Sequence, residues 1–210
     1  MKTIVIIVLA LFCVSCRFSD ENSNYYFTAA QPEASEAVKT IPRRFLGKYL
    51  DENGDTLVVS KTEVIRKYYS GWSVNKDSIY GTLIKHQEDG GKVLVTGADK
   101  DSVYMQTVTA DTLFKIQSEK VAKYFKGYLL VNTPADDAWH VSVYQVHEDS
   151  LYISRYVYAD DYSTFSAAIN DVHTNADTTK VWVNPTRKEL KKILKLKLGR
   201  AEGFRRIASR

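Results

Sequence analysis

Residues 45–60 read FLGKYLDENGDTLVVS, and this stretch indicates a β-hairpin. Two apolar-rich runs, residues 45–50 and 56–60, flank a polar turn that contains Asn53-Gly54. The Asn-Gly pair is a strong hairpin signal because both positions of a two-residue turn adopt positive φ. The sequence therefore predicts that the folded body begins as antiparallel β-structure.

Short apolar runs separated by turns continue along the chain. They recur about every ten residues without a long helix between them, which is typical of an antiparallel meander. We expect further strands at residues 63–69, 78–85, 92–96, 102–108, 112–116, 127–131, 139–147, 151–158 and 180–183, and short helices at 118–124 and 164–169. The predicted fold class is mostly β, an antiparallel barrel or sandwich of about eight to ten strands.

The C-terminal region carries the clearest helix signal. Residues 184–186 (Asn-Pro-Thr) end a strand and supply a cap, and Glu189 follows Thr186 by three residues, as a capping box requires. One apolar stripe is formed by Leu190, Ile193, Leu194 and Leu198. We expect an amphipathic α-helix over residues 186–198 that packs this stripe on the sheet. Contact between its lysines and anionic lipids is the alternative.

The first 16 residues resemble the signal peptide of a bacterial lipoprotein. Lys2 precedes the apolar run 3–12, which is too short to span a bilayer but fits a secretory signal. The run leads to Cys-Val-Ser-Cys, residues 13–16, similar to a lipobox in which a small residue precedes the acylated cysteine. The resemblance implies a signal peptide at residues 1–15 and acyl chains such as palmitate on Cys16. It places the protein in the cell envelope, anchored to the outer membrane and facing the periplasm or the exterior.

The remainder divides into a polar linker and a body. Residues 16–42 contain Pro32 and Pro42 and no sustained apolar period, so we expect the acylated Cys16 to be followed by a flexible tether. Residues 43–210 are expected to form a single β-rich domain, which is long enough for one good core.

Charge is distributed unevenly around the formal net value of +4. Residues 180–210 carry a net charge of +9, whereas residues 16–179 carry −6. The basic segment has no nucleic-acid recognition motif, and an exported protein rarely meets nucleic acid, so no such partner is expected.

Motifs for catalysis are missing from the sequence. It contains no G-x-S-x-G, P-loop, H-E-x-x-H or G-x-G-x-x-G pattern. Both cysteines lie within the first 16 residues, so the body has none for a disulfide, a zinc site or a nucleophile. The pattern Asp51-x-Asn53-x-Asp55 resembles the start of a calcium loop, but Thr56 stands at the place of its glycine, and a hairpin turn explains the same residues. We expect a non-enzymatic protein with no cofactor and no metal site.

One triplet, Asp followed by Ser or Thr and then usually an apolar residue, occurs six times. Turn chemistry at strand starts explains it. The triplet also resembles an O-glycosylation acceptor of exported proteins in one group of Gram-negative bacteria. The resemblance makes the following residues candidate glycosylation sites: Thr56, Ser78, Ser102, Thr112, Ser150 and Thr178.

A stripe of tyrosines lies on one face of the expected strand 151–158. Alternation places Tyr152, Ser154, Tyr156 and Tyr158 together. Such a stripe can be the wet face of a sheet, the lining of a ligand cavity or a platform on which sugars stack. A β-barrel with a terminal helix resembles lipocalin-type architecture, whose interior holds one apolar ligand. The predicted function is therefore an envelope-anchored lipoprotein that binds a small apolar ligand in a barrel or sheet. The alternative is a structural or interaction protein whose partner is another envelope protein.

Overall fold

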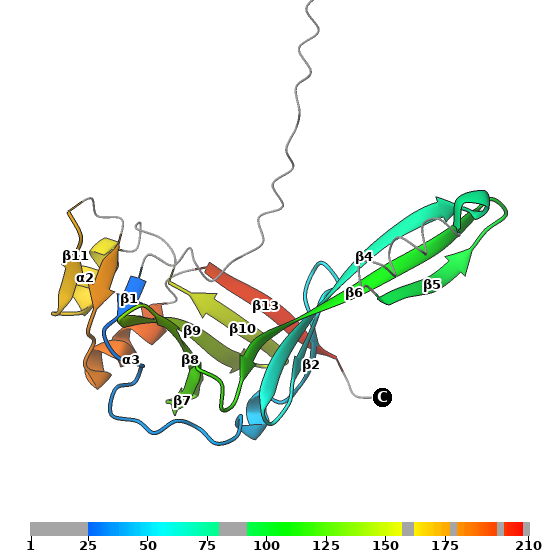
Figure 1. The fold of residues 1–210 in the computed structure, drawn as a ribbon. Helices are drawn as coiled ribbons and strands as arrows, with labels where there is room; N and C mark the ends of the chain where they lie inside the picture. The colour runs from blue at the N-terminus through cyan, green and yellow to red at the C-terminus, as the bar shows by residue number, and fades with distance from the viewer. Residues whose placement is uncertain (1–24, 80–91, 157–161, 177–179, 197–199, 208–210) are drawn as a thin grey trace, which may run out of the picture.

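The computed structural model describes residues 25–79, 92–156, 162–176, 180–196 and 200–207, and in them the chain is mostly β. Thirteen described strands form one mixed sheet (Figure 1). In chain order the elements are β1 (Tyr25–Phe27), η2 (Arg43–Phe45), β2 (Gly47–Leu50), β3 (Thr56–Val59), β4 (Glu63–Asn75), η3 (Lys76–Ser78), β5 (Lys92–Ala98), β6 (Ser102–Lys115), β7 (Val121–Phe125), β8 (Tyr128–Ala135), β9 (Ala138–His147), β10 (Ser150–Arg155), α2 (Tyr162–Ala168), β11 (Val172–Thr174), β12 (Val181–Val183), α3 (Arg187–Leu196) and β13 (Arg200–Ile207).

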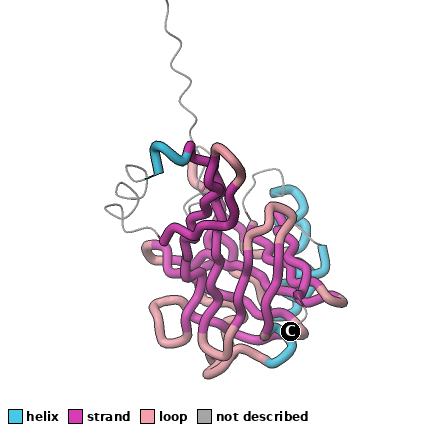
Figure 2. Tube along the Cα trace, turned by 90° about the vertical axis from the view of Figure 1, so that its right-hand side faces the viewer, coloured by secondary structure: helices cyan, strands magenta, loops and turns pink. Residues whose placement is uncertain are grey.

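Two groups of antiparallel strands make up most of the sheet, and the last strand of the chain joins them. One group is β2–β3–β4–β6–β5 and the other is β7–β8–β9–β10, which β1, β12 and β11 extend beside β9. Strand β13 lies between β10 and β2 and pairs antiparallel with both. Figure 2, which views the molecule from the side of the β4–β6–β5 strands, shows that strands form most of the body. The prediction of a mostly β fold is confirmed. The strand order departs from a simple meander, because β6 rather than β5 pairs with β4, and β1 pairs in parallel with β12. The sheet does not close into a barrel.

The predicted first hairpin is confirmed, although its turn differs from the expected Asn-Gly type. Strands β2 and β3 pair from Leu50 opposite Thr56. Gly54 alone in the turn adopts positive φ, at +86°. The Asp51 carboxylate accepts hydrogen bonds from the backbone N–H groups of Asn53 and Asp55, at 2.9 and 2.8 Å. The five residues 51–55 between the strands therefore form a turn that an aspartate side chain stabilises.

The core has two clusters of buried side chains on opposite faces of the sheet. Alternation along β8 sends Leu129 to one cluster and Leu130 to the other. The inner cluster fills the curved side of the sheet and includes Tyr49, Leu57, Phe114 and Phe204. The outer cluster lies between β8 and β9 and the elements that cover them: β1, β12, α2 and α3. The interior that a lipocalin-type barrel would offer to a ligand is thus occupied by side chains.

Strand β1 lies inside the stretch for which the sequence predicts a flexible tether. Tyr25 and Phe27 are fully buried, and β1 pairs in parallel with β12. The Asn132 side chain accepts a hydrogen bond from Gln31 N at 2.6 Å and donates to Gln31 O at 3.0 Å. The sequence did not reveal this packing, because β1 is only three residues long and is too short to show an apolar period. From Tyr25 onward the tether prediction is wrong.

Two further local predictions are wrong, a third lies mostly outside the described residues, and the last strand was missed. Residues 118–124 do not form a helix, since residues 121–125 form β7 and pair with β8. The expected turn between 108 and 112 is absent, because β6 runs unbroken to Lys115 with a bulge opposite Val64 and Ile65. Of the expected strand 78–85, Ser78 lies in η3 and residues from 80 on are outside the described part. Strand β13 was not predicted.

Helix α3 forms where the sequence predicts a C-terminal helix, and its capping box is present. Thr186 N donates to Glu189 Oε2 at 2.8 Å, and Glu189 N donates to Thr186 Oγ1 at 3.3 Å. The helix buries Leu190, Ile193 and Leu194 in the outer cluster. Its exposed residues include Lys188, Lys191, Lys192 and Lys195. In the described part of the chain, no helix has the length and apolar character needed to cross a membrane.

Candidate functional site

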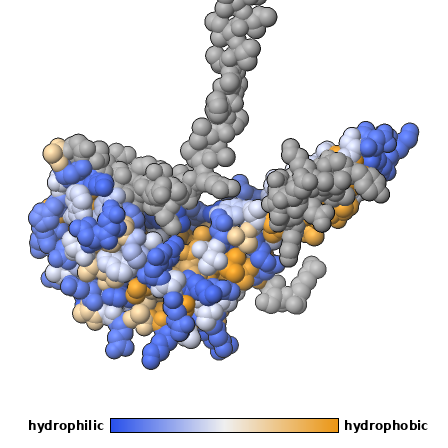
Figure 3. All heavy atoms as spheres, in the orientation of Figure 1, coloured by the Kyte–Doolittle hydropathy of each residue, from blue (hydrophilic) through white to orange (hydrophobic). Residues whose placement is uncertain are grey.

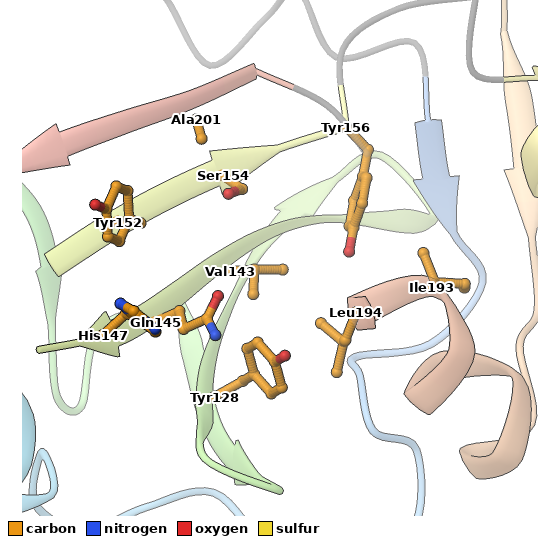
Figure 4. A pocket seen from close by; sticks show the side chains of 10 residues that line it. All are labelled: Tyr128, Val143, Gln145, His147, Tyr152, Ser154, Tyr156, Ile193, Leu194 and Ala201. Carbon is orange, nitrogen blue, oxygen red and sulfur yellow. The ribbon is translucent and has the colours of Figure 1, made fainter. Parts of the chain in front are cut away.

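A groove of about 420 Å³ lies on the outer face of the sheet, where helix α3 covers only part of it (Figure 4). Strands β8, β9, β10 and β13 form its floor, and α3 forms one end. Ten described residues line it: the aromatic Tyr128, Tyr152 and Tyr156, the polar Gln145, His147 and Ser154, and the apolar Val143, Ile193, Leu194 and Ala201. The volume falls in the range of about 300–1,000 Å³ that is typical of small-molecule sites.

A row of aligned residues crosses the groove. Tyr128 on β8 stands opposite Gln145 on β9, and Gln145 stands opposite Tyr152 on β10. The row ends at Gly203 on β13, opposite Tyr152. Residues directly opposite in adjacent strands have side chains about 5 Å apart. The Gln145 amide, which can donate and accept hydrogen bonds, therefore lies between two tyrosines.

The tyrosine stripe predicted from sequence contributes directly to this groove. Tyr152, Ser154 and Tyr156 line it, whereas Leu151 and Ile153 point to the inner cluster. The shared face is thus as the alternation predicted, and Tyr158 is outside the described residues. The stripe combines two of its predicted roles. Tyr152 is 38% exposed, as expected for a solvent-facing sheet surface, whereas Tyr156 is buried, as expected for a cavity lining.

The end of the groove beside α3 is apolar and fixed by packing. Val143, Ile193 and Leu194 are all buried there. The Tyr156 ring meets Phe165 edge to face, with centroids 5.1 Å apart and an angle of 85° between the planes. Edge-to-face pairs add to the stability of buried rings. This end is therefore preformed, while the end near His147 and Tyr152 opens to solvent.

Among the described residues that line the groove, none is a lysine, an arginine, an aspartate or a glutamate. Its polar groups are hydroxyls, one amide and the imidazole of His147. Burying a charged ligand without a partner of opposite charge is costly. The lining therefore suits an uncharged ligand that has both an apolar face and hydrogen-bonding groups.

Charged residues gather instead around Arg66, near the first hairpin. Its guanidinium donates to Asp51 Oδ2 at 2.9 Å and to Glu202 Oε2 at 2.6 Å, and Asp55 Oδ2 lies 3.5 Å away. Burial opposes the charge of Arg66, but Glu202, Tyr68 and Asp51 outweigh it and raise its pKa. The carboxylates of the calcium-like pattern are thus engaged by a cation and by the backbone. In the residues that the structure describes, no group of three metal-ligating side chains occurs.

The candidate modification sites are scattered rather than brought together. Cys16 and Thr178 lie outside the described residues. Thr56 is buried at the start of β3, and Ser102 and Ser150 are half-buried at strand starts. Ser78 in η3 and Thr112 within β6 are exposed. A glycan on Thr56 would require the first hairpin to open.

Sequence reasoning missed half of the groove. Tyr128, Gln145 and the α3 residues come from segments that only the strand register brings beside β10. Of the histidines, His147 lines the groove, His140 packs against Tyr26 with centroids 4.7 Å apart, and His173 Nε2 lies 2.6 Å from Asp171 Oδ1. His86 is outside the described residues.

Comparison of the chain with protein-family models, with curated proteins and with solved structures found no match in any of the three.

Proposed function

We propose that this chain is a non-enzymatic binding protein of the cell envelope that holds a small, uncharged, partly apolar ligand in the groove beside α3. The row Tyr128–Gln145–Tyr152 carries the proposal, because it offers two aromatic rings and a hydrogen-bonding amide on one open face. Ligand pockets commonly combine such an apolar lining with a few polar groups that set orientation.

The geometry suggests how the ligand is held. Its apolar part enters the end formed by Val143, Ile193 and Leu194, where burial removes apolar surface from water. Its polar part faces Gln145 and His147 near the open end. A ring in the ligand stacks against Tyr152, whose own ring is partly exposed.

Anchoring through acylated Cys16 remains part of the proposal, and so does the outer-membrane location. Its support is the lipobox-like sequence at residues 13–16. Cys16→Ala is expected to abolish membrane association, and fractionation of cell extracts measures it. A variant that stays firmly in the membrane fraction would contradict the anchor and leave the groove proposal untouched.

Native mass spectrometry on the full chain, extracted gently from its own host, tests ligand binding. We expect an additional mass of a few hundred daltons that is lost on denaturation. Gln145→Ala and Tyr152→Ala should lose this mass, whereas Tyr104→Ala, which removes an exposed tyrosine far along the chain from the groove, should keep it. A bare mass for the wild type, or a mass retained by both groove variants, would overturn the proposal.

A second candidate function is interaction with another envelope protein. The observation that favours it is a strand extension outside the body that exposes Leu94, Val95 and Tyr104. Cross-linking in intact cells tests it, with Lys76 and Lys100 as the reactive groups near the tip. Cross-links from these lysines to another polypeptide support the function, and their absence contradicts it.

A further inference from the structure

A three-stranded arm extends from the body (Figure 1). Strand β3 pairs with β4 only as far as Lys67, opposite Thr56. Beyond that point β4 pairs only with β6, which in turn pairs with β5. We define the arm as the distal parts of β4 and β6, residues 68–75 and 102–109, together with β5. Among the described residues, the arm leaves the body as a narrow ribbon.

Among the described strands, β5 is an edge strand, and its residues 93–98 lack the side chains that usually protect an edge. It is the last strand in the sheet order, and no other described strand pairs with its outer edge. Residues 93–98 contain neither a charge nor a proline. Leu94 is 50% exposed and Val95 is 61% exposed. Soluble proteins normally protect such edges with lysine, proline or a covering segment, because an open edge pairs with other strands. Apolar surface along the arm, inward of its polar tip, is visible in Figure 3.

The edge of β5 is complementary to itself when two copies pair antiparallel about the middle of Val95-Thr96. In that register Leu94 of one copy stands opposite Gly97 of the other, and Lys92 stands opposite Asp99. Gly97 is paired with Tyr104 within the arm, and a Cβ on Gly97 would lie 3.8 Å from Cδ2 of the Tyr104 ring. Tyr104 is 45% exposed. Leu94 thus meets the Tyr104 ring of the other copy.

Tyr104 is held in the position that this contact needs. Its hydroxyl donates to Asp99 Oδ2 at 2.6 Å. The other oxygen of Asp99 accepts hydrogen bonds from the backbone of Asp101 at 2.9 Å and of Ser102 at 2.7 Å. The turn between β5 and β6 therefore fixes the ring beside Gly97 before any partner arrives, which lowers the entropy cost of association.

We propose that the arm is a homodimerisation element, in which the β5 strands of two copies pair antiparallel to form one six-stranded sheet. The contact is isologous, so it closes with a pair and does not propagate into fibres. The proposal identifies the partner in the second candidate function, interaction with another protein, as a second copy of this chain. It does not depend on the groove, and its failure would leave the ligand proposal standing.

Sedimentation of the full chain in detergent tests the proposal, with circular dichroism to verify folding. We expect a concentration-dependent dimer. Leu94→Lys should weaken self-association by at least about tenfold, because it places an ammonium against an apolar ring. Leu196→Lys is the matched control, since Leu196 is a 43% exposed leucine on α3, and it should dimerise like the wild type. A wild type that is monomeric at every concentration overturns the proposal, as does a dimer that Leu94→Lys does not weaken.

Cysteine pairs test the register. Leu94→Cys mixed with Gly97→Cys should form an intermolecular disulfide, because the two positions face each other in the proposed register. Each variant alone should form none above the wild-type background, since its two copies lie too far apart for the roughly 7 Å limit between Cα atoms. Equal cross-linking in the separate and mixed samples would contradict this pairing.

Discussion

Tyr152 and Gly203 stand opposite each other on β10 and β13, and a Cβ on Gly203 would lie only 3.2 Å from Cε1 of the Tyr152 ring. Glycine therefore leaves the space in which this ring lies against the sheet at the open end of the groove. Aromatic rings that cover a strand glycine are a known way to shield its backbone. The position of the Tyr152 ring, and with it the shape of the groove, depends on the absence of a side chain at Gly203.

Gly203→Val is expected to displace the Tyr152 ring and reduce ligand occupancy, while the protein stays folded. The fold tolerates the change because Tyr152 is partly exposed and its ring can swing toward solvent. Native mass spectrometry measures occupancy, and thermal unfolding measures stability. Gly71→Ala is the control, because a Cβ at Gly71 comes no nearer than 3.7 Å to its closest neighbour, Met105 O. Unchanged occupancy in Gly203→Val would show that the ring position does not matter for binding.

Glu189→Ala should lower the free energy of unfolding by about 1–2 kcal/mol, because it removes a helix cap. The carboxylate accepts hydrogen bonds from Thr186 N and Oγ1 and from Asn170 N, at 2.8, 2.7 and 3.0 Å. It thereby connects the start of α3 to the segment after α2. Chemical denaturation measures the loss, and Glu36→Ala, at an exposed glutamate, should leave stability unchanged.

The same carboxylate predicts a pH dependence. The hydrogen bonds from the Thr186 side chain and backbone lower the pKa of Glu189 in the folded protein. A lowered folded pKa stabilises the fold above the unfolded pKa of about 4.3, and this stability is lost as the pH falls through the folded pKa. The gap in stability between wild type and Glu189→Ala should therefore narrow in acid. A gap that stays constant from neutral pH to pH 3 would contradict this linkage.

Lys123→Met is expected to release the segment that follows β1. The ammonium of Lys123 donates to the backbone carbonyls of Ala30, Pro32 and Glu33, at 2.8, 3.0 and 3.3 Å, and burial lowers its pKa. Leaving these carbonyls without a donor costs about 1–3 kcal/mol. Limited proteolysis should cut the variant near residues 29–36 faster than wild type. Lys115→Met, at an exposed lysine, serves as control. Equal cleavage rates in Lys123→Met and wild type would contradict the proposed role of Lys123.

Phe204→Ala should destabilise the protein by about 3–5 kcal/mol, as expected for a large cavity in a core. Phe204 is 1% exposed in the inner cluster, on the strand that joins the two groups of antiparallel strands. Thermal unfolding checks the prediction. Ile207→Ala, at a 37% exposed position near the end of the same strand, should cost far less. Equal losses in the two variants would indicate that β13 contributes through backbone pairing alone.

Features set by neighbouring residues could be predicted from the sequence. The hairpin at residues 51–55, the capping box of Thr186 and Glu189 and the alternation along β10 all depend on side chains a few positions apart. The pairing of β13 with β10 and β2 could not be predicted, because it joins residues more than 100 positions apart in the case of β2. Residues 121–125 show the same limit, since pairing with β8 overrides their local helical character.

The groove illustrates why half of a site can be visible in sequence and half hidden. Alternation along one strand tells which side chains share its face, so Tyr152, Ser154 and Tyr156 could be grouped. Nothing local tells that Ile193 and Leu194 on α3 lie beside Tyr156. By contrast, the two-residue turn after His147 is local, and it fixes the register that places Gln145 opposite Tyr152. A shift of one residue there would turn Gln145 to the opposite face.

The early start of the folded body has a consequence for where the protein can work. Strand β1 begins at Tyr25, which leaves roughly eight residues between it and Cys16. A fully extended chain spans at most about 3.6 Å per residue, so the linker between Cys16 and Tyr25 is no longer than roughly 30 Å. With Cys16 acylated as proposed, the body stays within about one small-domain diameter of the lipid headgroups. The molecules that it meets are then those that diffuse along or close to the bilayer surface.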